Sequence, residues 1–163
     1  MSTTFAQNDS IQDPYKKKNE FKVNAISLIL GAVDLTYERL LNDESAIGIN
    51  AFIRYDDEVF NNVEYYVSPY YRLYFGKKYA AGFFVEGFGM LNSSRKDFEI
   101  FFENENNDFV TDFALGIGLG GKWITKSGFV GEINYGLGRN LFNTEETDFD
   151  FVAKAGISLG YRF

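Results

Sequence analysis

The apolar residues of this chain recur at every second position over long stretches, and this period constrains the fold more than any other feature. In the run 47–56, Ile47 and Ile49 alternate with small or polar residues such as Gly48 and Asn50. Successive side chains of a β-strand point to opposite faces, so the period predicts strands with one apolar face. Eight such runs follow one another: 21–30, 33–38, 47–56, 66–75, 81–90, 112–123, 129–138 and 151–163.

The lengths of the runs and of their connections point to a membrane. Most runs have about ten residues, which a tilted strand needs to cross a bilayer, whereas strands of soluble proteins average about 5–6 residues. Short connections at 42–45, 76–80 and 125–128 alternate with longer ones at 57–63, 92–108 and 140–150, and only the first, at Gly31, breaks the pattern. Such asymmetry is typical of outer-membrane barrels, whose short turns and termini are periplasmic. We therefore predict an all-β fold, an eight-stranded antiparallel up-and-down transmembrane β-barrel over residues 20–163.

The two faces of the predicted strands differ in chemistry. One is almost wholly apolar, and the other is rich in glycine and carries single charges. Because side chains fill the interior of an eight-stranded barrel, we predict that the apolar face meets lipid and that the charges pair in a narrow lumen. Six basic and five acidic residues nearly balance, as buried charges require. The predicted lumen network consists of Lys22, Asp34, Glu38, Arg54, Arg72, Glu86, Asp112, Lys122, Glu132, Lys154 and Arg162.

An alternative keeps the strands and reverses the faces. It is a soluble barrel or β-sandwich whose charged face lies in water.

Two local expectations accompany the membrane barrel. Pro69 has no backbone N–H and predicts a bulge or a local defect in its strand. The inward glycines are expected to make room for Arg, Lys and Tyr side chains opposite them: Gly116, Gly118, Gly120, Gly136, Gly138, Gly156 and Gly160.

The first nineteen residues do not share the period. They are polar and contain Pro14 and the run Lys16–Lys18. We interpret residues 1–19 as a disordered N-terminal segment, and Thr3–Gln7 can equally be the remnant of a secretory signal peptide.

Composition excludes several classes of function. The chain has no histidine and no cysteine, which removes the usual general base and the commonest metal ligands. Its net charge of −7 argues against binding to nucleic acid, which needs a basic face. We therefore predict no catalytic residue, no cofactor and no metal site.

The longer connections are strongly acidic. Thirteen acidic residues face only Arg95 and Lys96 there. They predict a solvated rim or, alternatively, a site for divalent cations, although their spacing matches no EF-hand loop. The apolar stretch Phe98–Phe102 predicts either a hairpin that extends the neighbouring strands or an exposed edge that binds a partner. The acidic residues are Asp56, Asp57, Glu58, Glu64, Asp97, Glu99, Glu103, Glu105, Asp108, Glu145, Glu146, Asp148 and Asp150.

Several short motifs carry a resemblance to a known group of proteins. They are Lys22–Asn24, Leu35–Arg39, Pro69–Arg72 and Phe84–Phe88. With them, residues 21–163 resemble the small outer-membrane β-barrel proteins of Bacteroidetes and, more loosely, OmpX and the transmembrane domain of OmpA. The resemblance implies a place in the cell outer membrane, in contact with lipid and lipopolysaccharide.

The C-terminal residues resemble a signal for insertion into that membrane. The apolar residues alternate up to Tyr161 and Phe163, as in the terminal signal that the barrel-assembly machinery reads. The resemblance thus implies this machinery as a partner during insertion.

The predicted function is that of a non-enzymatic barrel. It stabilises the envelope or docks a protein partner through its acidic extracellular loops. The alternative is a narrow pore, or a barrel that binds a small ligand or cation. Small barrels that modify lipid A resemble a pattern with a catalytic His and Ser, and this chain has no His.

Overall fold

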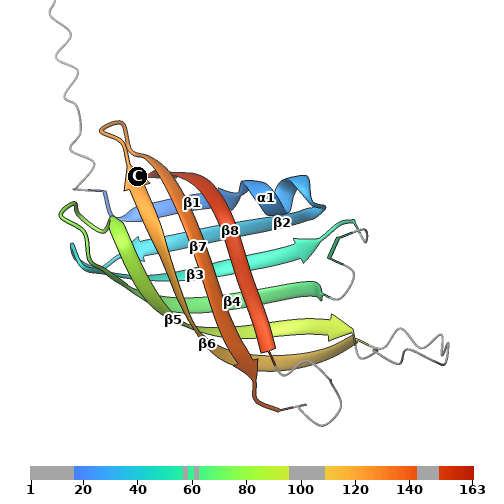
Figure 1. Cartoon of the computed structure of the whole chain (residues 1–163). Coiled ribbons are helices and arrows are strands. Elements are labelled where there is room, and N and C mark those ends of the chain that lie inside the picture. The colour runs from blue at the N-terminus through green and yellow to red at the C-terminus, as the bar shows by residue number, and fades with distance from the viewer. Residues whose placement is uncertain (1–16, 57–58, 61–62, 96–108, 143–150) are drawn as a thin grey trace, which may run out of the picture.

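Eight strands form one closed antiparallel sheet in the computed structural model, in which every strand pairs with its neighbours along the chain and β1 pairs with β8 (Figure 1). The structure describes residues 17–56, 59–60, 63–95, 109–142 and 151–163. This confirms the predicted eight-stranded up-and-down barrel. The strands are β1 (Asn19–Asn24), β2 (Ala32–Leu40), β3 (Ser45–Arg54), β4 (Val63–Tyr74), β5 (Gly82–Arg95), β6 (Phe109–Ile124), β7 (Phe129–Asn140) and β8 (Phe151–Arg162).

The two ends of the barrel differ. At one end, which we call the turn end, β1 begins and β8 finishes, and Asn19 and Phe163 exchange two backbone hydrogen bonds of 3.1 and 2.8 Å. The connections 41–44, 75–81 and 125–128 lie at the same end (Figure 1). The opposite end, which we call the loop end, is where β3, β5 and β7 finish.

The first run is where the predicted strand is wrong. Only Asn19–Asn24 is a strand, and Ala25–Ile29 forms the short helix α1. The Asn24 side chain caps this helix by accepting hydrogen bonds from the backbone N–H groups of Ile26 (3.2 Å) and Ser27 (3.4 Å). Asparagine is among the best N-cap residues, so the chain leaves the sheet at a residue suited to start a helix.

The helix also ends at a residue suited to end it. Leu30 donates its backbone N–H to the Ile26 carbonyl at 3.0 Å, and Gly31 follows with a φ of +97°. Glycine adopts this left-handed conformation without strain, and it commonly follows a helix for that reason. Within the described ranges, no helix is both long and apolar enough to cross a membrane.

Because β1 is short, part of β8 has no strand on one side. The pairing of β1 with β8 stops at Asn24 opposite Ser158, so residues 151–157 pair only with β7. Helix α1 lies in the gap between β2 and β8 at the loop end (Figure 1). The Asn24 amide donates a hydrogen bond to the Ala155 carbonyl at 3.3 Å and thereby satisfies one group of the open edge.

Pro69 does not insert a bulge. Pairs of β4 with β5 are missing at Ser68 and Pro69, but the register is the same on both sides of them. Pro69 still faces Ile49 in the regular ladder with β3. The defect is thus local, as expected of a residue without an N–H donor, and the register shift of this strand pair lies between Val63 and Tyr65.

The apolar residues face outward, as the alternation predicts. Ile117 on β6 is 77 % exposed, and large apolar side chains stay exposed around the outside of every strand. The interior near the turn end is filled by Leu40, Tyr74, Ala80 and Phe84. The connection 75–81 folds over this end of the lumen, because Ala80 and its neighbour Ala81 are fully buried although they lie in a turn.

Candidate functional site: the charged lumen

Nine charged side chains meet inside the barrel, and we call them the charge cluster. Every strand except β3 contributes at least one of these residues. Each residue occupies an inward position of its strand, so its side chain points into the lumen. Five are basic and four are acidic, and all are buried. They are Glu20, Lys22, Glu38, Arg72, Glu86, Lys122, Glu132, Lys154 and Arg162.

Glu38 on β2 is the centre of the cluster. Its carboxylate, which is fully buried, accepts hydrogen bonds from Lys22 (3.0 Å), Arg72 (2.9 Å) and Lys122. Two phenol hydroxyls, of Tyr70 and Tyr74, donate to the same carboxylate. Five donors therefore share two oxygens, which fills the roughly four lone-pair sites of a carboxylate.

Arg72 on β4 links the cluster across the lumen. Its guanidinium contacts the carboxylates of Glu38, Glu86 and Glu132 at 2.7–2.9 Å. It also lies over the ring of Phe84, 3.7 Å from the centroid. A planar fork of donors suits several carboxylates at once, and the ring beneath it holds the fork in place.

Glycine on β3 makes room for this arrangement. A Cβ at Gly48 would meet the ring of Tyr70, which reaches Glu38 from the neighbouring strand. Other inward glycines also make room for side chains, but several of these are phenylalanines and not the predicted Arg, Lys and Tyr. Gly116 and Gly120 lie against Phe88 and Phe84, whereas Gly160 lies against Lys22 as expected.

Sequence reasoning missed Glu20. It is fully buried and contacts Lys122 (2.8 Å), Arg162 (2.7 Å) and Lys22 (3.8 Å). Because Glu20 precedes Lys22 by two residues, the period of two places both side chains on one face. Glu20 was missed because the first alternating run was begun at residue 21, just beyond the predicted N-terminal segment. With Glu20 added, the inward charges number six basic and six acidic residues.

Arg162 connects the cluster to the turn end. Besides Glu20, its guanidinium donates hydrogen bonds to the carbonyls of Tyr79 and Ala80, both at 2.9 Å. The last strand thus holds the connection 75–81 over the lumen.

Three residues of the predicted network lie outside the cluster. Asp34 is buried in a polar chamber closer to the loop end and accepts hydrogen bonds from Asn24 and Asn50. Arg54 is half-buried and donates to the Phe60 carbonyl at 3.1 Å. Asp112 accepts hydrogen bonds from the backbone N–H groups of Phe113 and Phe142.

The polar chamber around Asp34 is small. Its volume of about 10 Å³ is close to what one water molecule needs. The Oδ1 atom of Asn50, which lines it, has no hydrogen-bond partner within the described part of the chain. Among the described residues, no group of three acidic side chains is placed to hold a metal ion.

These contacts define what the lumen can do chemically. Each carboxylate of the cluster faces at least one Lys or Arg, so its oxygens are occupied by cations of the protein itself. Buried ion pairs need good geometry to offset desolvation, and in this cluster most of the charged groups have two or more polar contacts. The arrangement suits a packed, charge-balanced interior.

Some predicted features fall elsewhere. Most of the acidic loop residues and the stretch Phe98–Phe102 lie outside the described residues, as do residues 1–16. Tyr161 and Phe163 point outward, 45 % and 52 % exposed. Their role as an assembly signal stays a prediction.

Comparison with solved structures gives the class to which this fold belongs. The N-terminal β-barrel domain of OprF from Pseudomonas aeruginosa matches with a TM-score of 0.64, covering 90 % of this chain and 98 % of that chain, at 13 % identity. The backbone structure of the Yersinia pestis outer membrane protein Ail in a phospholipid bilayer nanodisc matches at 16 % identity with a TM-score of 0.41. This match covers 90 % of this chain and 99 % of that chain. The topology and the match to the OprF domain show that the chain has the fold of a small eight-stranded outer-membrane β-barrel.

No protein-family model matches the sequence, and no curated protein matches it either. The resemblance to barrels of Bacteroidetes stays a prediction.

Proposed function

We propose that this protein is an integral barrel of a bacterial outer membrane, with a closed lumen and no catalytic activity, that strengthens the envelope or docks a partner. The observation that carries the proposal is the division between the two faces of the sheet. Charged side chains are buried inside, and large apolar side chains are exposed all around the outside. Contiguous apolar surface of this extent favours contact with lipid over contact with water.

Dependence on detergent tests the membrane assignment. We expect the purified barrel to be monodisperse in detergent micelles and to aggregate when detergent is removed, as measured by light scattering. Protein that stays monodisperse in detergent-free buffer contradicts the outward apolar face in a membrane.

Two layers of side chains support the closed lumen. The charge cluster spans the interior, and the connection 75–81 covers the turn end with Ala80 and Ala81 buried. We expect no single-channel conductance when the protein is inserted into a planar bilayer. Steady ion conductance contradicts a closed lumen and favours the narrow pore.

The docking role is supported by charge. Thirteen acidic residues against two basic ones in and directly beside the longer connections favour a partner with a basic surface. A decalysine peptide serves as a probe for binding to the barrel in nanodiscs. We expect binding that weakens with salt and that falls when Glu99, Glu103 and Glu105 are replaced by Gln, and binding unchanged by these substitutions contradicts the loops as the site.

The second candidate, a narrow pore or cation-binding barrel, is favoured by one observation. The chamber at Asp34 combines a buried carboxylate with the Oδ1 atom of Asn50, which has no hydrogen-bond partner among the described residues. Its size of about 10 Å³ has no room for a hydrated ion, so conduction requires the side chains that line it to rearrange. Conductance measurements therefore distinguish the two candidates.

A further inference from the structure

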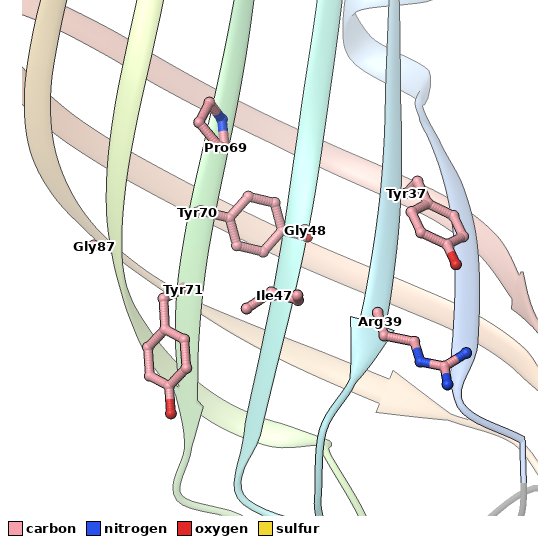
Figure 2. Close-up of a pocket in the computed structure, with 8 residues that line it drawn as sticks. All are labelled: Tyr37, Arg39, Ile47, Gly48, Pro69, Tyr70, Tyr71 and Gly87. Atoms are coloured by element: carbon pink, nitrogen blue, oxygen red, sulfur yellow. The ribbon is translucent and has the colours of Figure 1, made fainter.

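A shallow apolar groove runs across the outer face of the barrel near the turn end. It has a volume of about 440 Å³ and crosses β2 to β5 (Figure 2). Six of the residues that line it are Tyr37 and Arg39 on β2, Ile47 on β3, Pro69 and Tyr71 on β4, and Gly87 on β5.

The groove arises where small residues interrupt the apolar exterior. Ile47 is the cross-strand partner of Arg39 and of Tyr71, and Tyr71 is the partner of Gly87, so these four residues form one row across the sheet. Gly87 leaves a gap in this row, because a Cβ there would have no heavy atom within 4 Å. Its partner on β6 is the outward Ile117, so the gap lies between Tyr71 and Ile117.

A guanidinium group lies at the turn-end side of this groove. In Figure 2, Arg39 lies closer to the turn end than Tyr37 and Pro69 do. Arg39 Nη1 donates a hydrogen bond of 2.8 Å to Asn19 Oδ1, which also accepts one of 2.9 Å from the Tyr37 hydroxyl. Among the described residues, the Arg39 guanidinium thus bonds to a neutral amide and pairs with no carboxylate. Several of its N–H donors remain for an anion.

The exposed charges around this end are mostly basic. The described residues at the turn end include six basic side chains, Lys17, Lys18, Arg39, Lys77, Lys78 and Lys126, against the two acids Asp43 and Glu44. Lys17 lies over the ring of Tyr161, 5.2 Å from its centroid, on the strand beside β1. Basic clusters next to the apolar belt of a membrane protein attract anionic lipid headgroups.

We propose that the groove binds one acyl chain of an anionic glycerophospholipid, whose phosphate is held by Arg39. The apolar floor suits the chain, and a guanidinium suits a phosphate with two parallel hydrogen bonds. This inference rests on the proposed membrane location, with the turn end in the leaflet that contains phospholipid. The proposed function does not require a specific lipid-binding site, so this site goes beyond it.

Native mass spectrometry of the delipidated full chain tests the proposal. The protein in detergent is incubated with equal amounts of phosphatidylglycerol and phosphatidylethanolamine, and bound lipids are counted. We expect one retained phosphatidylglycerol, in at least threefold excess over phosphatidylethanolamine. Arg39→Gln and Gly87→Leu, which remove the phosphate ligand and fill the groove, are each expected to lower this retention at least threefold.

Two matched variants serve as controls. Lys78→Gln removes an exposed cation at the same end that does not line the groove, and Gly121→Leu fills open space at an outward glycine of β6. Both are expected to keep the lipid. Circular dichroism in detergent verifies that each variant is folded, and Gly87→Leu tests the site even where Arg39→Gln does not fold.

Three outcomes overturn the lipid site. They are equal retention of the two lipids, several lipids bound without preference, and retention that neither Arg39→Gln nor Gly87→Leu lowers. A barrel that aggregates without detergent and yet shows any of these results keeps its membrane assignment and loses only this site.

Discussion

At the scale of single residues, the interior depends on how many partners each buried charge has. Among the described residues, Arg72 contacts three carboxylates, whereas Lys154 contacts one carboxylate, that of Glu86, at 2.6 Å. Removing one member of a buried ion network leaves its partners buried without compensation, and this costs more than the network itself contributes. The two cations should therefore differ in their effect on stability.

We predict that Arg72→Leu lowers the free energy of unfolding by about 3–5 kcal/mol, because it strips partners from Glu38, Glu86 and Glu132. Lys154→Met should cost less, since Glu86 keeps Arg72 as a partner. Urea unfolding in detergent micelles measures both, with Lys78→Gln as an exposed control. Equal stability of Arg72→Leu and the unchanged protein contradicts a paired interior.

Neighbouring glycines on β6 separate the two faces. A Cβ at Gly120 would meet the ring of Phe84 and the Ile133 carbonyl, whereas a Cβ at Gly121 has nothing within 4 Å. We predict that Gly120→Leu destabilises the folded barrel by about 1–3 kcal/mol or more through overpacking. Gly121→Leu should leave stability in micelles nearly unchanged, and the same urea unfolding measurement compares them. The reverse order contradicts the assignment of inside and outside.

At the scale of elements, β1 and α1 decide how tightly the barrel is closed. In β8, Phe163 donates its N–H to Asn19, so the odd-numbered residues direct their backbone groups toward β1. Beyond Asn24, toward the loop end, no strand pairs with this side of β8. The backbone N–H groups of Ala153, Ala155 and Ile157 therefore lie on the open edge. The even-numbered residues between them pair with β7.

Amide hydrogen exchange in micelles reports this difference residue by residue. We predict fast exchange at Ala153 and Ala155 and slow exchange at Lys154 and Gly156, because only the second pair donates to a neighbouring strand. Leu159, an odd-numbered residue opposite Val23, should be protected and serves as the control. Uniform protection along β8 indicates instead that residues 25–30 pair as the strand that the period of two predicts.

At the scale of the whole molecule, the charge cluster and the turn end form one continuous interior. Arg162 joins them, since its guanidinium contacts Glu20 on one side and the carbonyls of Tyr79 and Ala80 on the other. A single side chain of the last strand therefore couples barrel closure to the covering of the lumen.

We predict that Arg162→Ala releases the connection 75–81 and increases tryptic cleavage after Lys78 several-fold, because hydrogen bonds no longer hold the carbonyl that follows it. Cleavage after Lys126, in a turn that Arg162 side-chain atoms do not hold, should stay the same. Mass spectrometry of the fragments from folded protein in micelles measures both sites. Unchanged cleavage after Lys78 contradicts this coupling.

The sequence by itself determined the number of strands, their faces and the class of barrel. These follow from a local rule, because a period of two decides which side chains share a face before any strand finds its partner. The same rule identifies all eleven predicted inward charges, and it includes Glu20 once the first strand is begun at Asn19.

The tertiary structure alone decided which charges meet and where the first strand stops. Glu38 and Glu132 belong to strands far apart in the chain, and closure of the barrel brings both to Lys22 and Arg72. Asn24 can extend a strand or cap a helix, and both faces of 25–30 are largely apolar, so the period of two predicts a strand there although a helix forms. The Asn24 side chain bonds to Asp34 at 2.9 Å and to the Ala155 carbonyl, contacts that exist only across the closed barrel.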